Sequence, residues 1–260
     1  MGLANRAVRE AARLLGGVRG GEKEGLWWNG FGVKWESDAL HANLPAMPDP
    51  SNSSHEQKSL VRQGYERCAA AYDAARQDEA FPQLALLSRR LADGASVLDI
   101  GCGAGVPVAH SLCERYMVTG VDISGAMIKL ARQHVPEANF IESDIMALDL
   151  PAASFEAIVS FYAIFHIPRE EHAELFRRIY RWLKPGGYLL VTLSFDDEPV
   201  YTENDFFGAQ MAWSNYDLDS YLRLLQSTGF QLLETTRLGH GFSGEADHDA
   251  EAHPLVLAQK

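Results

Sequence analysis

Short apolar runs alternate with helical patterns through the middle of the chain. Apolar residues that recur every three or four positions predict helices, and short apolar runs between turn residues predict strands. Helices are expected at Gly125–His134 and Arg169–Leu183, between strands at Ser96–Ile100, Met117–Val121, Asn139–Ile141, Glu156–Ser160 and Tyr188–Ser194. This alternation is typical of a parallel sheet that helices cover on both faces. The sequence therefore predicts an α/β fold with a doubly wound sheet.

Further elements are expected on either side of this core. A helix from His55 to Arg76 places Val61, Tyr65, Cys68 and Tyr72 on one face, and a second helix around Leu84, Leu87 and Leu91 ends at Asp93-Gly94. A final helix, Asp217–Thr228, precedes two strand-like runs, Phe230–Thr235 and Pro254–Gln259, with no helix between them. These two strands are predicted to pair antiparallel at the edge of the sheet.

Residues 1–54 differ in composition from residues 55–260. The stretch GLWWNGFGVKW gathers aromatic side chains among glycines, and LPAMPDPSNSS has the composition of a linker. We expect an N-terminal extension and linker that covers the main domain or forms part of a lid, followed by one domain over residues 55–260. The Arg-rich start permits an organelle transit peptide, but it lacks serine, so a cytoplasmic location is expected.

Composition narrows the possible partners. The chain has 260 residues, is 47% hydrophobic and carries a formal net charge of -12, which disfavours a nucleic-acid partner. It has no apolar run long enough for a transmembrane helix, so no membrane partner is expected. Its three cysteines, Cys68, Cys102 and Cys113, lack disulfide or zinc spacing and are expected to be reduced. A small-molecule partner is left, and nothing specifies an oligomeric state.

A glycine turn marks the candidate binding site. In SVLDIGCGAGVPVAH, Gly101, Gly103 and Gly105 follow the first strand and precede a helix. Glycine tolerates positive φ and lets a ligand lie against the backbone, and a helix N-terminus adds N–H donors. A dinucleotide fold requires a small third residue in GxGxxG, whereas Val106 stands there. The turn therefore suits another nucleotide or a zwitterion better.

Two acidic residues end the next two strands. Asp122 stands 21 residues after Gly101, where a carboxylate can accept hydrogen bonds from a ribose diol. Alternatively, Asp122 caps the helix Gly125–His134, a role that Ser124 could also fill. Asp144 ends the third strand, and an adenine amino group could donate to it.

Five motifs together resemble a known family. VLDIGCGAGVP, VTGVDIS, FIESDIMAL, IVSFYAIFHI and YRWLKPGGYLLVTL are similar, in order and position, to the motifs of class I S-adenosylmethionine-dependent methyltransferases that act on small molecules. The resemblance runs from about Gln57 to the C-terminus. It implies a Rossmann-like, seven-stranded sheet whose last two strands form the antiparallel pair, and S-adenosylmethionine as the cofactor.

The resemblance also implies roles for individual residues. The turn would hold the methionine part of the cofactor, Asp99 its ammonium group through water, and Asp122 its ribose. Tyr65 and Tyr72 lie on the helix face that would close over it, although both also fit ordinary core positions. The full set of expected cofactor-binding residues is Tyr65, Tyr72, Asp99, Gly101, Cys102, Gly103, Gly105, Asp122, Ile123, Met127, Asp144, Ile145, Ser160 and Phe161.

The acceptor side is expected after the fourth strand and in the long connection DDEPVYTENDFFGAQMAWSNYDLDS. His166 follows that strand and is the candidate general base, or else a cap of the helix from Arg169. His172, within that helix among charges, is expected to be solvated. Aromatic side chains in the connection predict an apolar or aromatic substrate. The expected substrate-binding residues are Tyr162, His166, Tyr201, Trp213 and Tyr216.

Several other functions are disfavoured or left open. The chain lacks the Asn/Asp-Pro-Pro-aromatic motif of amino-directed DNA methyltransferases, and Ser160 stands where magnesium-using O-methyltransferases need an acid. The tail HGFSGEADHDAEAHP contains possible metal ligands, but an acidic hairpin loop explains it better and no metal is expected. Two alternatives remain: a methyltransferase-like protein that catalyses a cyclisation or isomerisation, and a non-enzymatic domain that binds a partner protein.

Overall fold

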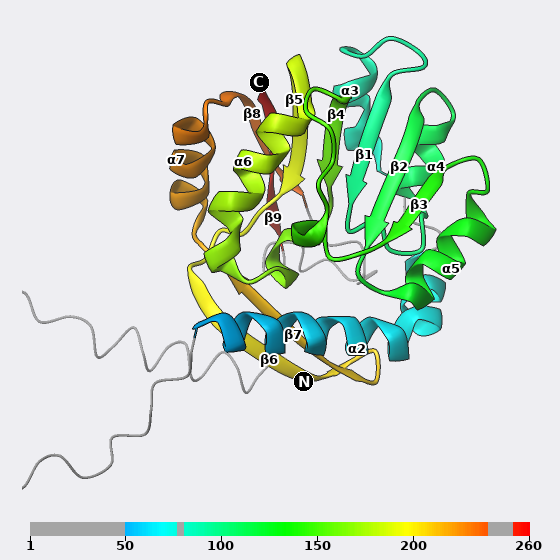
Figure 1. Cartoon of the computed structure of the whole chain (residues 1–260), viewed down its shortest axis with the longest axis vertical. Helices are drawn as coiled ribbons and strands as arrows, with labels where there is room; N and C mark the ends of the chain where they lie inside the picture. Colours follow the sequence, from blue (N-terminus) through cyan, green and yellow to red (C-terminus); the bar gives the residue numbers. More distant parts are fainter. Residues whose placement is uncertain (1–49, 77–80, 239–251) are drawn as a thin grey trace, which may run out of the picture. The chain divides into compact units, whose positions relative to one another are not determined.

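A seven-stranded sheet forms the centre of the molecule. The computed structural model describes residues 50–76, 81–238 and 252–260. The sheet has the order β3-β2-β1-β4-β5-β9-β8, with β1 to β5 parallel and β9 antiparallel to both of its neighbours. Its strands are β1 Ser96–Ile100, β2 Met117–Asp122, β3 Asn139–Glu142, β4 Phe155–Ser160, β5 Leu183–Thr192, β8 Gln231–Leu238 and β9 His253–Gln259. The expected doubly wound sheet and its antiparallel strand pair are confirmed (Figure 1).

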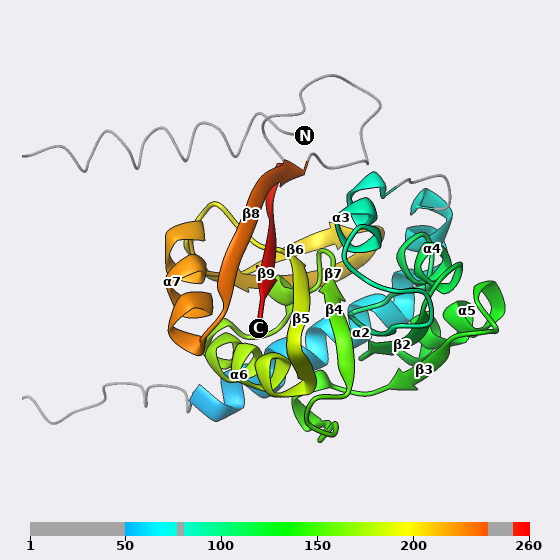
Figure 2. The ribbon, with the colours of Figure 1, turned by 90° about the horizontal axis from the view of Figure 1, so that it is seen from above.

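Helices cover both faces of this sheet (Figure 2). The α-helices are α2 Pro50–Arg76, α3 Ala85–Ser88, α4 Val108–Cys113, α5 Gly125–His134, α6 His172–Trp182 and α7 Leu218–Thr228. Short 3-10 turns complete the connections: η1 Pro82–Leu84, η2 Ile145–Ala147, η3 Ile164–His166 and η4 Arg169–Glu171. Helices α3, α4 and α5 contribute to the apolar cluster on one face, and α6 and α7 to the cluster on the other.

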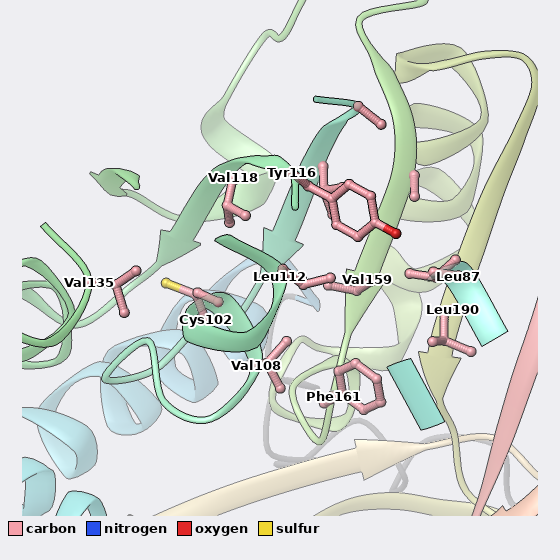
Figure 3. Close-up of a cluster of buried hydrophobic side chains, with 14 of the residues drawn as sticks. Leu87, Cys102, Val108, Leu112, Tyr116, Val118, Val135, Val159, Phe161 and Leu190 are labelled. Atoms are coloured by element: carbon pink, nitrogen blue, oxygen red, sulfur yellow. The ribbon is translucent and has the colours of Figure 1, made fainter. Parts of the chain in front are cut away.

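Side chains that alternate along the strands contribute to the apolar clusters on both faces of the sheet. On β1, Val97 joins the first cluster and Leu98 the second, because successive side chains of a strand point to opposite faces. Figure 3 shows the first cluster, in which Leu112 of α4 lies beside Val159 of β4. Phe161, just after β4, belongs to the same cluster. The core thus extends to the carboxyl ends of the strands.

A separate layer crosses these carboxyl ends. It consists of α2 and a two-stranded antiparallel hairpin, β6 Glu198–Phe206 and β7 Ala209–Asn215 (Figure 1). Val61 and Cys68 of α2 pack against Met211 and Ala212 of β7 in a small apolar cluster of their own. We call α2 and the hairpin together the cover.

Several boundaries differ from the sequence-based expectation. Helix α2 begins at Pro50, inside the expected linker, and the helix around Leu84 ends at Ser88 rather than at Asp93-Gly94. The long connection after β5 is a hairpin and not a loop. Its β6 strand was missed because most of its side chains are exposed on both faces, so it lacks the alternation of a half-buried strand. The expected extension up to residue 49, and the tail from 239 to 251, lie outside the described residues.

No helix in the described part of the chain has the length and apolar composition that crossing a membrane requires. The cysteines Cys68 and Cys102 are buried, Cys113 is half-buried, and all three are free thiols.

The close approach of α2 to the hairpin depends on Gly64. A Cβ at this position would lie 2.7 Å from the backbone oxygen of Gln210 and 2.8 Å from the Cε atom of Met211. We therefore expect Gly64→Ala to lower the free energy of unfolding by about 1–3 kcal/mol, although alanine normally favours a helix. Gln63→Ala is the control, because Gln63 is exposed and, within the described part of the chain, its side chain bonds to Ser59 on the same helix. Urea denaturation of the two variants checks this, and equal stability would show that the helix and the hairpin do not need this contact.

Candidate functional site

Two adjoining cavities lie between the carboxyl ends of the strands and the cover. The larger has a volume of about 730 Å³ and the smaller about 460 Å³. They share Tyr72, Gly101, Gly103 and Phe161 as lining residues, so a single elongated ligand could occupy both. Of the cofactor-binding residues expected from the sequence, these cavities bring together Tyr65, Tyr72, Asp99, Gly101, Cys102, Gly103, Asp122, Ile123, Met127, Asp144, Ile145 and Phe161.

The glycine turn forms the floor between the cavities. Gly101 and Gly103 have φ angles of +70° and +53°, which side chains rarely adopt. A Cβ at Gly101 would lie 2.1 Å from the Cβ atom of Ala163, whereas a Cβ at Gly103 would point into open space. Gly103 therefore leaves its backbone open toward a ligand. Gly105 lines neither cavity, and a Cβ there would point toward Ala131 of α5 and Phe140 of β3, at 3.3 Å from each.

Asp122 connects the glycine turn to the start of α5. Its Oδ2 atom accepts a hydrogen bond from the Gly103 amide at 3.0 Å, and its Oδ1 atom accepts one from the Ser124 amide at 2.9 Å. Burial raises the pKa of this carboxyl to about 6. Ser124, and not Asp122, caps α5 by accepting a hydrogen bond from the Met127 amide. A carboxylate offers about four acceptor positions, so Asp122 retains capacity toward the larger cavity that it lines.

Asp99 is a buried carboxylate with an unused acceptor. Its side chain lines the smaller cavity, is 2% exposed, and its Oδ2 atom has no hydrogen-bond partner among the described residues. Burial, and then the negative charge of Asp122, raise the pKa of Asp99 to about 7. An ionised carboxylate in this position requires a cation or a donor in the cavity.

Arg76, which the sequence analysis missed, lies in the same smaller cavity. Its side chain is buried, and its Nη1 atom donates a hydrogen bond to the Tyr72 hydroxyl at 2.5 Å. Its guanidinium also lies 5.4 Å from the ring centroids of both Tyr72 and Tyr162. A signal was present, since Arg76 stands one helical turn after Tyr72 and so shares its face of α2. The smaller cavity therefore presents a carboxylate and a guanidinium to the same ligand.

Tyr65 and His166 form a hydrogen-bonded pair at the wall of the larger cavity. The Nδ1 atom of His166 lies 2.9 Å from the Ala212 carbonyl oxygen, and its Nε2 atom lies 2.9 Å from the Tyr65 hydroxyl. Because a carbonyl only accepts, Nδ1 carries the proton and Nε2 accepts from Tyr65. Burial lowers the pKa of His166 to about 4, so the ring is neutral at physiological pH. His166 lies where the sequence analysis expects it, but its unprotonated Nε2 atom already accepts a hydrogen bond from Tyr65.

His172 is buried, so the expectation that it is solvated is wrong. It lies on the apolar face of α6 with Leu175, Phe176 and Ile179. Its Nε2 atom bonds to the Ile167 carbonyl at 2.9 Å, and its Nδ1 atom bonds to the Tyr221 hydroxyl at 3.0 Å. Burial lowers its pKa to about 4. This histidine is structural.

The aromatic residues expected to bind substrate divide into two groups. Tyr162, at a φ of +56°, lines the larger cavity beside His166. The Trp213 ring lies 5.4 Å from the His166 ring, and the Tyr201 ring stacks on Trp213. Neither Trp213 nor Tyr201 lines either cavity. Tyr216 packs against His172 and Tyr221, away from the site, because it follows the end of β7 on the side of α6 and α7. Ser160 also lines neither cavity, since its hydroxyl donates to the Ile100 carbonyl beneath the site.

Lys58 closes the far end of the larger cavity and was also missed. Its Nζ atom lies 2.8 Å from Oδ2 of Asp144 and 2.5 Å from Oε2 of Glu171. The other oxygen of Asp144 accepts a hydrogen bond from the Met146 amide. Asp144 thus lines the cavity as expected, but it also anchors α2 through Lys58.

Known proteins are similar in sequence to part of this chain. The methyltransferase-domain family matches residues 97–187. Phosphoethanolamine N-methyltransferase 3 of Arabidopsis thaliana is 32% identical over 149 residues, which are 54% of this chain and 30% of that protein. Trans-aconitate 2-methyltransferase of Azoarcus sp. (strain BH72) is 37% identical over 115 residues, which are 43% of this chain and 44% of that protein.

A solved structure extends the similarity to most of the chain. The crystal structure of Burkholderia thailandensis 1,6-didemethyltoxoflavin-N1-methyltransferase, with bound 1,6-didemethyltoxoflavin and S-adenosylhomocysteine, superposes with a TM-score of 0.61 at 21% identity and covers 85% of this chain and 93% of that chain. Residues 97–187 therefore match the methyltransferase-domain family, and the chain has the Rossmann-like fold of this solved structure, as its motifs predicted. The matched stretch spans less than half the length of either curated relative.

The unused acceptor of Asp99 leads to a stability prediction. Its pKa is about 7 in the folded protein and 3.8 ordinarily, so its stabilising contribution is complete below pH 3.8 and is lost as the pH rises through about 7. We expect Asp99→Asn to raise the free energy of unfolding by about 2–4 kcal/mol near pH 8 and to change it little near pH 4.

Urea denaturation at the two pH values tests this expectation. Asp149→Asn is the matched control, because that side chain is 90% exposed and pairs with Arg181 at the surface. A less stable Asp99→Asn variant near pH 8 would show that the folded protein does not hold an uncompensated carboxylate there.

Proposed function

We propose that this chain, with its class I methyltransferase domain, binds S-adenosylmethionine across the two cavities and transfers its methyl group to a small molecule. The observation that carries the proposal is the unused acceptor of Asp99 in a cavity that also holds Arg76 and continues toward Asp122. No single small ion matches this set. A molecule with an amino-acid end and a nucleoside end does.

The smaller cavity fits the amino-acid end. An ammonium group would meet Asp99, and a carboxylate would meet Arg76, so both charges of a zwitterion find a buried partner. The positive φ of Gly103 leaves backbone exposed at the passage to the larger cavity. This match between two charges on the protein and two on the ligand supports S-adenosylmethionine over a plain nucleotide.

The larger cavity fits the nucleoside end. Asp122 lies beside Ile123 and would accept hydrogen bonds from the two ribose hydroxyls. Ile145 and Met127 offer apolar walls for a flat base, and Asp144 with the Ile145 amide would bind the adenine edge. The sequence predicts these roles for Asp122, Asp144 and Ile145, and all three residues line the larger cavity.

The chain's own residues would prepare the acceptor for the transfer. When bound, S-adenosylmethionine supplies a methyl group on a positively charged sulfur atom. The cover places Tyr65 and Tyr72 beside the glycine turn, where they would limit the access of water to the bound cofactor. Tyr65 donates its proton to His166, so the remaining lone pairs of its oxygen can accept a hydrogen bond from the N–H or O–H of an acceptor.

In this arrangement His166 affects the acceptor through Tyr65 and does not contact the acceptor itself. Its Nδ1 bond to the Ala212 carbonyl orients the ring, and its Nε2 atom orients the Tyr65 hydroxyl. The side chains around this pair, Tyr72, Phe161 and Tyr162, are aromatic, which supports an apolar or aromatic acceptor. We propose that Tyr65 contacts the acceptor and that His166 positions it.

Cofactor identity is tested by ligand-induced stabilisation. We expect S-adenosylhomocysteine to raise the melting temperature, with a gain of about 2.7 kcal/mol at a hundred times its Kd, whereas NADP gives no comparable shift. Asp122→Asn should weaken binding about ten- to hundredfold in calorimetry, and the exposed Asp149→Asn should not. A larger shift with NADP would contradict the proposal.

Turnover tests the role of Tyr65. Because Tyr65→Phe removes the oxygen that faces the acceptor but keeps the ring, we expect kcat to fall about a hundredfold while the Kd for S-adenosylhomocysteine stays within a few-fold. His166→Gln should lose less, since its amide oxygen can still accept from Tyr65. Tyr188→Phe, in β5 and outside both cavities, is the control. Unchanged kcat in Tyr65→Phe would remove the residue from the reaction.

A further inference from the structure

The positive charges of the site are already engaged. Among the described residues that line the two cavities, the cations are Lys58 and Arg76. Lys58 is 17% exposed and is held between the carboxylates of Asp144 and Glu171. Arg76 lies in the smaller cavity, where the proposed function assigns it to the carboxylate of the cofactor. Neither cation is therefore available to pair with a negatively charged group on an acceptor molecule.

Carboxylates outnumber the cations on the same walls. The carboxylates of Asp122 and Asp144 line the larger cavity, and those of Asp73 and Asp99 line the smaller one. A phosphate or carboxylate on the acceptor would enter this field without a cation to pair with. Burying an unpaired anion costs several kcal/mol, so such an acceptor is disfavoured.

Aromatic faces surround the place where the acceptor would sit. Tyr65, Tyr72, Phe161 and Tyr162 all line the larger cavity, and the Tyr65 and Tyr72 rings lie 5.5 Å apart at nearly a right angle. Such faces attract an alkylammonium group, most strongly when water is excluded. They therefore stabilise positive charge that develops on the acceptor.

The Tyr65–His166 pair suits an acceptor whose free base attacks without help from a general base in the site. Because burial lowers the pKa of His166 to about 4, the ring is a weak proton acceptor. A hydroxyl must lose its proton as it attacks, whereas an amine that has already lost its proton to solvent at mildly alkaline pH attacks with its own lone pair. A phenolate or alkoxide would also add negative charge to walls that already carry it.

We propose that the methyl acceptor is a primary or secondary amine that bears no phosphate or carboxylate group. The inference rests on the proposed function and specifies its substrate class. The amine lone pair forms the N–CH3 bond while the S–CH3 bond breaks, and the electron pair of that bond stays on sulfur. The resulting ammonium group contacts the aromatic faces, and its excess proton leaves to water after release.

Matched probes separate this class from others. We would load the full chain with S-adenosylhomocysteine, measure the additional thermal stabilisation by each probe at mildly alkaline pH, and measure methyl transfer with S-adenosylmethionine. One set is 2-phenylethylamine, phenylalanine and 2-phenylethanol, which differ by a carboxylate or by a hydroxyl in place of the amine. The second set is ethanolamine and phosphoethanolamine. We expect the plain amines to bind and react at least about tenfold better than their partners.

A charge variant tests the reason for this preference. Glu171→Gln removes one of the two carboxylates that hold Lys58, so the wild-type preference for ethanolamine over phosphoethanolamine should shrink by about fivefold. Glu170→Gln is the control, because that neighbouring side chain is 66% exposed and contacts Arg169 instead of Lys58.

The outcomes distinguish the inference from its premise. If S-adenosylhomocysteine itself fails to stabilise the protein, the proposed function fails. If S-adenosylhomocysteine binds but phosphoethanolamine, phenylalanine or 2-phenylethanol surpasses its amine partner, the proposed function stands and the amine inference is overturned. Binding of the cofactor with no response to either plain amine would overturn it as well.

Discussion

Buried negative charge at one edge of the sheet is the constraint on which the rest of this structure depends. The parallel strands β1, β2 and β3 deliver Asp99, Asp122 and Asp144 to or near their carboxyl ends, and the cover then removes these side chains from bulk water. Each carboxylate is compensated differently. Asp122 accepts two backbone N–H groups, Asp144 pairs with Lys58, and Asp99 keeps an unused oxygen.

The cover is built around this charge. Along α2, Lys58 pairs with Asp144 and Glu171, Arg62 pairs with Glu142, and Arg76 enters the smaller cavity. On another face of the same helix, Gly64 permits close contact with β7. The helix therefore joins an apolar contact with the hairpin to polar contacts with the sheet, and its position determines whether Tyr65 reaches His166.

Function and stability oppose each other at Asp99. An ionised carboxylate without a partner destabilises the folded protein, yet in the proposed function it is this group that would distinguish a zwitterionic ligand from other ligands. The same reasoning extends to the acceptor. With Lys58 held by Asp144 and Glu171, with Arg76 assigned to the cofactor in the proposed function, and with neutral Tyr65 and His166 at the wall, the site as we propose it would favour positive charge that develops during the reaction over negative charge.

The amino-acid sequence by itself determined the sheet, the glycine turn and the strand-end acids, because these depend on contacts between near neighbours in the chain. Alternation of apolar residues sets the strands, and Asp122 follows β2 wherever that strand lies. Tertiary structure alone decided which partners these groups have. Tyr65 and His166 are 101 residues apart, and Lys58 and Asp144 are 86 apart. No local pattern encodes such pairs. For the same reason the sequence misplaced Tyr216 and His172, whose surroundings come from α6 and α7, and missed Arg76, whose role appears only where a long helix crosses the ends of strands that follow it in the chain.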